Sequence, residues 1–113
     1  MTRGELWWVD LGLPYGSEPG YRRPVLIVQN DFFNKSKINT TVIIPLTTNI
    51  LYADAPGNIV VNIKESNLNK ESIAVISQIK VIDKKRLKEK ISKVSKEIMD
   101  QVETGMKLVL GFR

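Results

Sequence analysis

The sequence predicts a mainly β domain that ends in one helix. Most of the chain consists of short runs of β-branched and aromatic residues separated by turn-forming residues, which is typical of strands. Only the C-terminal part changes its period, because Ile98, Val102, Met106 and Val109 recur at helical spacing. Strands followed by a single helix predict a small, strongly bent sheet or barrel with the helix packed on it. The 113 residues suffice for one domain, expected to span 1–113, with a real core.

Six strands are expected, at residues 5–10, 23–29, 40–47, 58–63, 72–82 and 91–94. The first has aromatic and β-branched residues that suit a half-buried pleat, and the second is apolar on both faces, as a central strand is. Pro45 in the third cannot donate to a ladder, so we expect an edge or a bulge there. Residues 11–21 contain two prolines and three glycines and form a loop, and such long loops are often functional.

The expected helix covers residues 96–110. Ser95 is a suitable N-cap, and Glu97 lies in the first turn, where the helix dipole favours a negative charge. We expect its apolar face to pack on the sheet and to carry no chemistry of its own.

The chain contains no cysteine and no histidine. These absences exclude a disulfide, a thiolate metal site, a cysteine nucleophile and the usual general base, histidine. Any catalysis must therefore use Arg, Lys, carboxylates, hydroxyls and backbone groups. The absence of histidine also removes the commonest ligand of transition metals. We expect no metal and no cofactor. No apolar run approaches the roughly 18 residues of a membrane helix, and the first residues have no apolar stretch, so we expect a cytoplasmic protein without a membrane partner.

The net charge is +5 and the isoelectric point about 9.6. This balance favours a polyanionic partner, either a nucleic acid or an acidic protein segment. The densest positive charge is the basic run, which we define as residues 84–96. It is interpreted either as a solvated face or as a patch that follows phosphates.

The segment Arg22-Arg23-Pro24 is the most informative motif. It places two cations in a turn at the mouth of the second strand, where Pro24 pushes Arg23 towards extended geometry. A guanidinium held in a defined direction suits a phosphate, because it offers a fork of donors and stays charged. The alternative is that both arginines are solvated loop charges.

Four further segments occur in a characteristic order: Arg3-Gly4-Glu5 opening a strand that ends in Asp10-Leu11; Gly16-Ser17-Glu18-Pro19-Gly20 followed by Arg23-Pro24-Val25-Leu26-Ile27-Val28-Gln29-Asn30-Asp31; Pro45-Leu46-Thr47-Thr48; and Ser77-Gln78-Ile79-Lys80 continuing to Leu87. In these segments, and over nearly its whole length, the chain resembles the MazF/PemK toxins of bacterial type II toxin–antitoxin systems. The resemblance implies an SH3-like β-barrel of the MazF/PemK/CcdB type with a C-terminal helix, assembled as a homodimer.

The resemblance also implies a sequence-specific, metal-independent endoribonuclease (an mRNA interferase) that cuts single-stranded RNA and leaves 2′,3′-cyclic phosphate and 5′-hydroxyl ends. The implied partner is a small acidic antitoxin of the MazE kind, whose disordered tail covers the RNA groove. Two alternatives stay open: a non-catalytic RNA-binding barrel, and a gyrase-poisoning toxin on the same fold that acts through its C-terminal helix.

Carried over residue by residue, the resemblance implies that Arg23 and Thr47 are catalytic, with Thr48 one position off the pattern. It implies that the loop with Ser17 and Glu18 forms part of the RNA groove and moves on antitoxin binding, and that Gln78 lies on the long strand at the groove floor. The chain departs from the family pattern at two positions. Ser77 stands where many members have an acidic residue. Lys80 stands where several members have Arg, and a lysine keeps the charge but lacks the bidentate fork of a guanidinium.

RNA transesterification needs a base for the 2′-hydroxyl, an acid for the 5′-oxygen and stabilisation of the charge on phosphorus. Arg23 suits the third role and is too basic for the first. Thr47 can donate its hydroxyl to a phosphate oxygen, and Glu18 is the candidate base. For RNA binding we further expect residues near the loops and strand ends to stack on bases or contact base edges and phosphates: Tyr15, Tyr21, Arg22, Pro24, Asn30, Phe32, Phe33, Thr48, Asn49 and Lys80.

Overall fold

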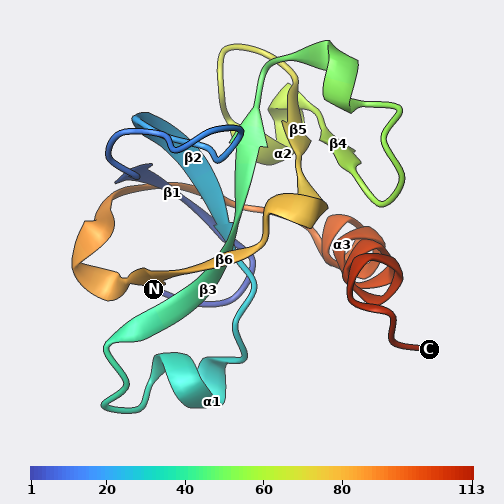
Figure 1. Cartoon of the computed structure of the whole chain (residues 1–113). Coiled ribbons are helices and arrows are strands. Elements are labelled where there is room, and N and C mark those ends of the chain that lie inside the picture. The colour runs from blue at the N-terminus through green and yellow to red at the C-terminus, as the bar shows by residue number, and fades with distance from the viewer.

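The structure, a computed structural model, describes residues 1–113. One curled sheet forms its centre, and a C-terminal helix lies beside it (Figure 1), which confirms the predicted mainly β fold with a closing helix. The strands are β1 (Glu5–Asp10), β2 (Arg22–Ile27), β3 (Thr40–Thr47), β4 (Ile59–Val61), β5 (Ser72–Ala74), β6 (Lys80–Asp83) and β7 (Leu87–Lys93). The helices are α1 (Asp31–Asn34), α2 (Ile63–Ser66) and α3 (Lys96–Leu110), with three 3₁₀ turns, η1 (Ile50–Tyr52), η2 (Ile76–Gln78) and η3 (Lys84–Arg86).

The strands are antiparallel to their neighbours and follow the order β4-β5-β3-β2-β1-β7. β1 and β2 form a hairpin in which Leu6 pairs with Leu26 and Trp8 with Pro24. β2 is therefore flanked on both sides, as its apolar sequence predicts. The other edge of β1 pairs with β7, with two register shifts that bend the sheet.

The prediction of one strand over residues 72–82 is wrong. Two short strands, β5 and β6, run along β3, and η2 interrupts them. The break faces Pro45: β6 pairs with β3 as far as Ile43, and β5 pairs with it from Leu46. Pro45 has no N–H for a continuous ladder, so the opposite chain keeps one bond to its carbonyl, from Val75 N at 3.0 Å, and then turns. Pro45 thus lies inside the sheet at a change of partner strand.

Several other predicted boundaries shift. The second strand begins at Arg22 and ends before Gln29, the fourth is reduced to β4, and the sixth is longer than predicted, as β7. Two one-turn helices were not predicted, although each has an asparagine N-cap: Asn30 accepts from Phe32 N before α1, and Asn62 accepts from two amides before α2. The basic run forms η3, β7 and the start of α3.

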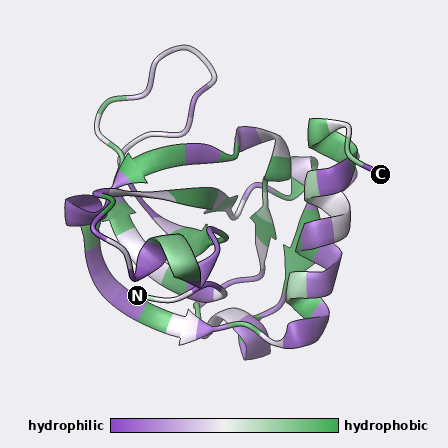
Figure 2. Ribbon diagram, turned by 90° about the horizontal axis from the view of Figure 1, so that it is seen from below, coloured by the Kyte–Doolittle hydropathy of each residue, from purple (hydrophilic) through white to green (hydrophobic).

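The predicted helix is confirmed as α3. Ser95 caps its N-terminus by accepting a hydrogen bond from Ile98 N, and the helix ends at Gly111, whose φ of 77° is a left-handed C-cap. Much of the hydrophobic part of its ribbon lies on the side of the sheet (Figure 2). Ile98, Met99 and Val102 are buried there, whereas Leu108 and Leu110 near the C-terminal end are exposed. No helix in the structure is both long enough and apolar enough to span a membrane.

The hydrophobic core has two parts. The larger lies between the sheet and α3, and the smaller lies within the curl of β1, β2, β3 and β6. Gly105 lets α3 approach the loop before β4 closely: a Cβ at this position would lie 2.4 Å from the carbonyl oxygen of Gly57. The helix and this loop are thus packed backbone to backbone.

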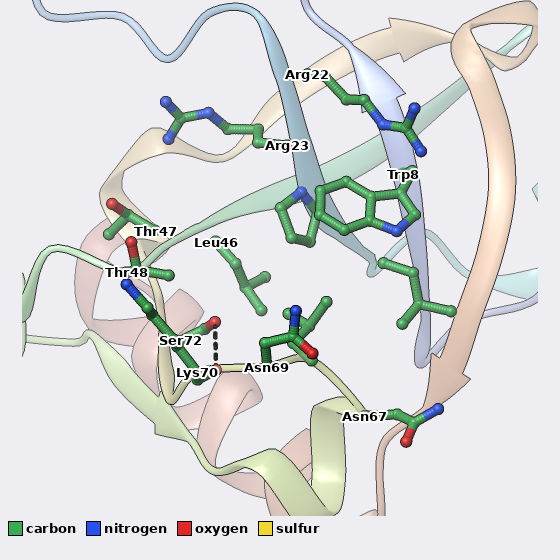
Figure 3. Close-up of a pocket in the computed structure, with 13 residues that line it drawn as sticks. Trp8, Arg22, Arg23, Leu46, Thr47, Thr48, Asn67, Asn69, Lys70 and Ser72 are labelled. Atoms are coloured by element: carbon green, nitrogen blue, oxygen red, sulfur yellow. Dashed lines mark hydrogen bonds between the residues drawn. The ribbon is translucent and has the colours of Figure 1, made fainter.

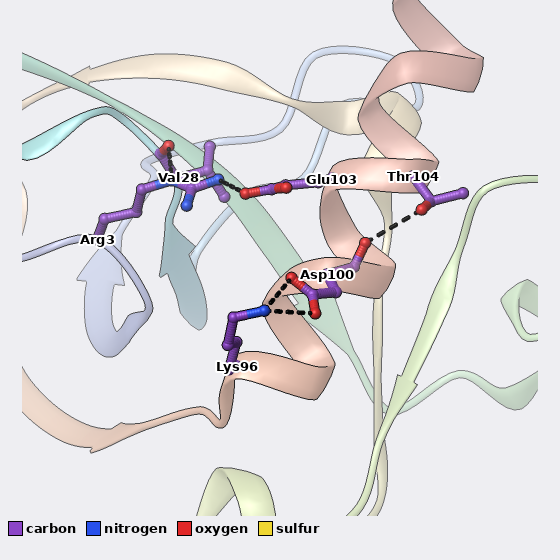
Figure 4. A network of polar contacts seen from close by, with 6 residues as sticks. All are labelled: Arg3, Val28, Lys96, Asp100, Glu103 and Thr104. Atoms are coloured by element: carbon purple, nitrogen blue, oxygen red, sulfur yellow. Dashed lines mark hydrogen bonds and ion pairs between the residues drawn. The ribbon is translucent and has the colours of Figure 1, made fainter. Parts of the chain in front are cut away.

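Polar contacts tie the N-terminus to α3 (Figure 4). The Arg3 guanidinium donates to the carbonyl oxygen of Val28 at 3.0 Å and to the Glu103 carboxylate at 2.9 Å. The backbone amide of Arg3 donates to Asp31 at 2.8 Å. Hydrogen bonds from Asn34 and from this amide lower the pKa of Asp31. These contacts fix the start of β1, and with it one side of the sheet that carries the candidate site.

Candidate active site

A cavity of about 560 Å³ opens where β2 begins and β3 ends (Figure 3). From one side it is lined by Arg22, Arg23 and Pro24 of β2 and by Thr47 and Thr48 at the end of β3. Five of the residues proposed from the sequence therefore meet in one place. The two strands that carry them are neighbours in the sheet, which explains how segments more than twenty residues apart come together.

Arg23 is the second residue of β2, in agreement with the strand predicted over residues 23–29, and it pairs with Val9 of β1. Arg22, predicted in the turn before the strand, is instead the first residue of β2. Its Nε donates to the carbonyl oxygen of Gly20 at 3.1 Å, which anchors the side chain to the preceding loop. The two terminal guanidinium nitrogens have no hydrogen-bond partner in the protein. Arg23 is half-buried, so it presents a free, charged pair of donors from a fixed position.

Arg22 also lies within β2 and lines the same cavity, but it already has partners. Its guanidinium carbon lies 5.0 Å from the ring centroid of Trp8, a cation–π distance, and its Nη2 lies 3.8 Å from the Glu89 carboxylate. Figure 3 shows the Arg22 guanidinium next to the Trp8 ring. Arg22 therefore shapes the wall of the cavity more than it presents free donors.

Thr47 is half-buried, and its hydroxyl oxygen accepts a hydrogen bond from Asn49 N at 3.2 Å. This bond occupies the oxygen and leaves the hydroxyl proton available to donate. Thr48 is exposed beside it. Asn49 thus contacts Thr47 through its backbone amide. Its side chain caps η1 by accepting a hydrogen bond from Leu51 N at 3.1 Å.

The opposite wall was not predicted from the sequence. We call it the far wall and define it as residues 67–70, between α2 and β5. It brings two asparagine amides and the Lys70 ammonium group to the cavity. A signal existed, since this polar stretch interrupts an apolar region, but no sequence spacing connects it to Arg23. With Arg22 and Arg23, Lys70 makes three cations among the lining residues, and no carboxylate is among them.

A second cavity, of about 720 Å³, lies between the 11–21 loop and η2. Five of the predicted site residues line it: Tyr15, Ser17, Glu18, Gln78 and Lys80. Gln78 lies in the 3₁₀ turn and not on a long strand, which corrects its predicted position. Glu18 is in a different cavity from Arg23 and Thr47, so a role as their base requires the loop to move.

Asn30 lies apart from both cavities. Its side chain caps α1, accepting from Phe32 N at 2.8 Å, and it lines a small separate hollow with Arg3 and Glu103. The aromatic candidates near the loops, Tyr15, Tyr21, Phe32 and Phe33, are all exposed. Phe32 and Phe33 pack edge to face with each other at 5.5 Å on α1.

The basic run is in part a structural element. Lys84 donates to the carbonyl oxygen of Asn34, Arg86 to that of Asp10, and Lys90 pairs with Glu5 at 3.3 Å. Burial alone would raise the pKa of Glu5. Hydrogen bonds from the Trp7 indole, from Thr2 and from Lys90 outweigh it and lower the pKa to about 2. No group of three or more acidic side chains lies close enough together to hold a metal ion.

Comparison with known proteins identifies the family. The model of the PemK-like, MazF-like toxins of type II toxin–antitoxin systems matches residues 2–110. The chain belongs to this family. Relatives of the toxin include the endoribonucleases MazF2 of Mycobacterium bovis and MazF6 of Mycobacterium tuberculosis, each 34% identical over 110 residues, which are 97% of this chain and 96% of the relative.

Solved structures agree on the fold. A mycobacterial endoribonuclease in complex with its cognate antitoxin superposes on the toxin with a TM-score of 0.80 at 23% identity, covering 100% of this chain and 97% of the other. The resemblance stated from the sequence motifs is therefore confirmed at the level of family and fold.

Proposed function

We propose that this toxin is a sequence-specific endoribonuclease that cuts single-stranded RNA, mainly mRNA, without a metal ion. The observation that carries the proposal is the meeting of Arg23 and Thr47 in one cation-rich cavity that no carboxylate lines. Such a cavity suits the phosphodiester backbone of RNA, and the relatives named endoribonuclease support the activity.

The reaction is a transesterification. The 2′-hydroxyl loses its proton and attacks the neighbouring phosphorus, the bond to the 5′-oxygen breaks, and that oxygen takes up a proton from water. The products are therefore a 2′,3′-cyclic phosphate and a 5′-hydroxyl. Negative charge grows on the non-bridging oxygens during the attack. The free guanidinium nitrogens of Arg23 are placed to stabilise that charge, and the Thr47 hydroxyl donates to the same oxygens.

Glu18 is the proposed base for the 2′-hydroxyl. Because Glu18 lines the second cavity, we propose that RNA binding moves the 11–21 loop and brings its carboxylate towards Arg23. The loop contains Gly12 and Gly16, both with positive φ, which are suitable pivots for such a movement. Tyr15, Ser17, Gln78 and Lys80 would then contact bases or phosphates on this side, while Arg22, Pro24 and Thr48 contact the RNA beside Arg23.

The biological partner is proposed to be an acidic antitoxin of the MazE kind, whose disordered tail binds the same cationic surface. The solved mycobacterial relative in complex with its cognate antitoxin supports this assignment. We further propose that the toxin is a homodimer that acts in the cytoplasm, where mRNA is translated. Asn30 and Asn49 remain proposed contacts for RNA, although both side chains also cap short helices.

The test is to incubate one long mixed-sequence RNA with the purified toxin in EDTA and to map both new ends. Cuts at one short repeated word, with 5′-hydroxyl ends, are expected. RNA that stays intact while it binds the protein would favour a non-catalytic binding barrel. A DNA gyrase supercoiling assay tests the remaining alternative, and we expect no inhibition.

A further inference from the structure

The far wall, residues 67–70, faces Arg23 and Thr47 across the cavity (Figure 3). Its backbone is held on two sides. Asn67 ends α2 in a left-handed conformation with φ of 60°, and its amide donates to the Ile63 carbonyl oxygen at 2.9 Å. At the other end the Ser72 hydroxyl donates to the Lys70 carbonyl oxygen at 3.4 Å. The wall is therefore a fixed part of the cavity.

Helix α2, from which the wall begins, is in turn fixed to the sheet. The Ser92 hydroxyl on β7 donates to the carbonyl oxygens of Glu65 and Ser66, at 3.2 and 2.9 Å. The Glu65 carboxylate accepts from Ser95 N at 2.7 Å. These contacts hold the far wall at a set separation from β2 and β3, which is what a binding site for an extended chain needs.

The side chains of the far wall are free to bind a ligand. Lys70 is exposed and has no ion-pair partner in the protein, and its side chain extends towards Thr48 (Figure 3). Arg23 and Lys70 thus approach the two threonines from opposite walls. Asn69 is also exposed, and its amide makes no hydrogen bond within the protein. Such an amide both donates and accepts, as recognition of a base edge requires.

We propose that the far wall is a second RNA-binding surface of the active site. Lys70 binds the phosphate next to the scissile one, and Asn69 forms hydrogen bonds with the edge of an adjacent base. Two separate cations on opposite walls match two successive phosphates of one strand better than a single small anion. The inference rests on the proposed function of the same cavity, but it concerns binding, so it can be tested without cleavage.

The first experiment measures salt dependence. A short, fluorescein-labelled, mixed-sequence RNA with 2′-O-methyl riboses, which cannot undergo transesterification, is titrated with the full chain between about 50 and 200 mM salt. For Lys70→Gln we expect the slope of log K against log salt to become shallower by about 0.7, the value for one lost phosphate contact on a single strand. Lys64→Gln removes an exposed lysine of α2 that lines neither cavity, so it is the matched control and should keep the wild-type slope.

The second experiment compares binding to 2′-O-methyl oligo(A), oligo(C) and oligo(U). We define the spread as the ratio of the largest to the smallest of the three dissociation constants. Asn69→Ala should reduce this spread by about tenfold, within the range for loss of a good base contact. Asn39→Ala changes an exposed asparagine between α1 and β3 that lines neither cavity, and it should leave the spread unchanged. Circular dichroism and thermal melting show whether each variant is folded.

An unchanged slope in folded Lys70→Gln, or an unchanged spread in folded Asn69→Ala, overturns the inference for that residue even where the wild type cleaves RNA normally. Conversely, the wild type could bind RNA with a slope that depends on Lys70 and yet leave unmodified RNA intact. That result would support RNA binding by the far wall and would contradict the proposed endoribonuclease activity. Absence of any RNA binding by the wild type contradicts both proposals.

Discussion

Arg23 of β2 and Thr47 of β3 lie two residues beyond the pair Val25–Pro45 on adjacent antiparallel strands, and both face one cavity. The β2–β3 register therefore sets their relative position, and a loop does not. A strand pair is a rigid support for a catalytic constellation. Any slip of the register by one residue would turn one of the two side chains to the other face of the sheet.

The hydroxyl of Thr47 is predicted to contribute to the chemical step. Thr47→Ala should lower the single-turnover cleavage rate by about 10²-fold, as expected for loss of one preorganised donor to a developing oxyanion. Thr47→Ser keeps the hydroxyl and should recover most of the rate. Quenched-flow cleavage of a short RNA that contains the recognised word measures both. If the Ala and Ser variants were slowed equally, the methyl group of Thr47 would matter and its hydroxyl donor would not. If both kept the wild-type rate, neither group would contribute.

Glu18 is predicted to act as the general base. In Glu18→Gln the rate should fall, and it should lose its rise with pH on the acid side of the profile, because the amide cannot accept the 2′-hydroxyl proton. The measurement is the cleavage rate of wild type and variant over a series of buffers. A variant that keeps the full wild-type rate at every pH removes Glu18 from the mechanism.

Glu5 is predicted to make stability depend on acid pH. Its pKa in the folded protein is about 2, below the ordinary 4.5, so the ionised carboxylate stabilises the fold above about pH 4.5. This stabilisation, up to about 3 kcal/mol, is lost as the pH falls from 4.5 towards 2. Glu5→Gln should lower the free energy of unfolding at pH 7 and flatten its decline in acid, as urea titrations measure.

The control for that experiment is Glu71→Gln, which removes an exposed carboxylate. It should change the free energy of unfolding by less than about 0.5 kcal/mol at pH 7. If Glu5→Gln behaves in the same way as Glu71→Gln, the contacts from Thr2, Trp7 and Lys90 do not stabilise the ionised Glu5.

Gly105 is predicted to be required for the packing of α3. Alanine normally stabilises a helix interior by about 1 kcal/mol relative to glycine. Here a Cβ would lie 2.4 Å from the Gly57 carbonyl oxygen, so Gly105→Ala should instead destabilise by about 1–3 kcal/mol. Thr104→Ala, one residue earlier and exposed, should be close to neutral. A thermal melt that shows Gly105→Ala to be more stable than the wild type would contradict the close contact.

Local patterns were sufficient to predict much of the fold. Helix α3, its cap at Ser95 and the central position of β2 follow from spacing and residue type alone. The split of residues 72–82 does not, because it depends on the partner strand: the missing N–H of Pro45 lies nearly thirty residues earlier in the sequence. The length of a strand in a sheet depends on the residues of the neighbouring strand as well as on its own β-propensity.

The site was predictable to a similar extent. The Arg22-Arg23-Pro24 motif indicated Arg23, and the family resemblance implied Thr47. The register of β2 with β3 is consistent with their meeting in one cavity. Residues 67–70 stood out as a polar stretch, but their position at the cavity could not be predicted, because they reach it only through the packing of α2 on β7. The placement of Glu18 and Gln78 in a second cavity likewise depends on how the 11–21 loop folds back on η2.

The most direct test of the account is Arg23→Ala, measured for both cleavage and binding. The variant should show no detectable cleavage of the recognised RNA word, because it lacks the guanidinium donors that are proposed to stabilise the charge growing on the phosphate oxygens. Its affinity for a 2′-O-methyl version of the same RNA should fall by no more than about tenfold, since the other cations of the cavity remain. Wild-type cleavage by folded Arg23→Ala would contradict the proposed mechanism.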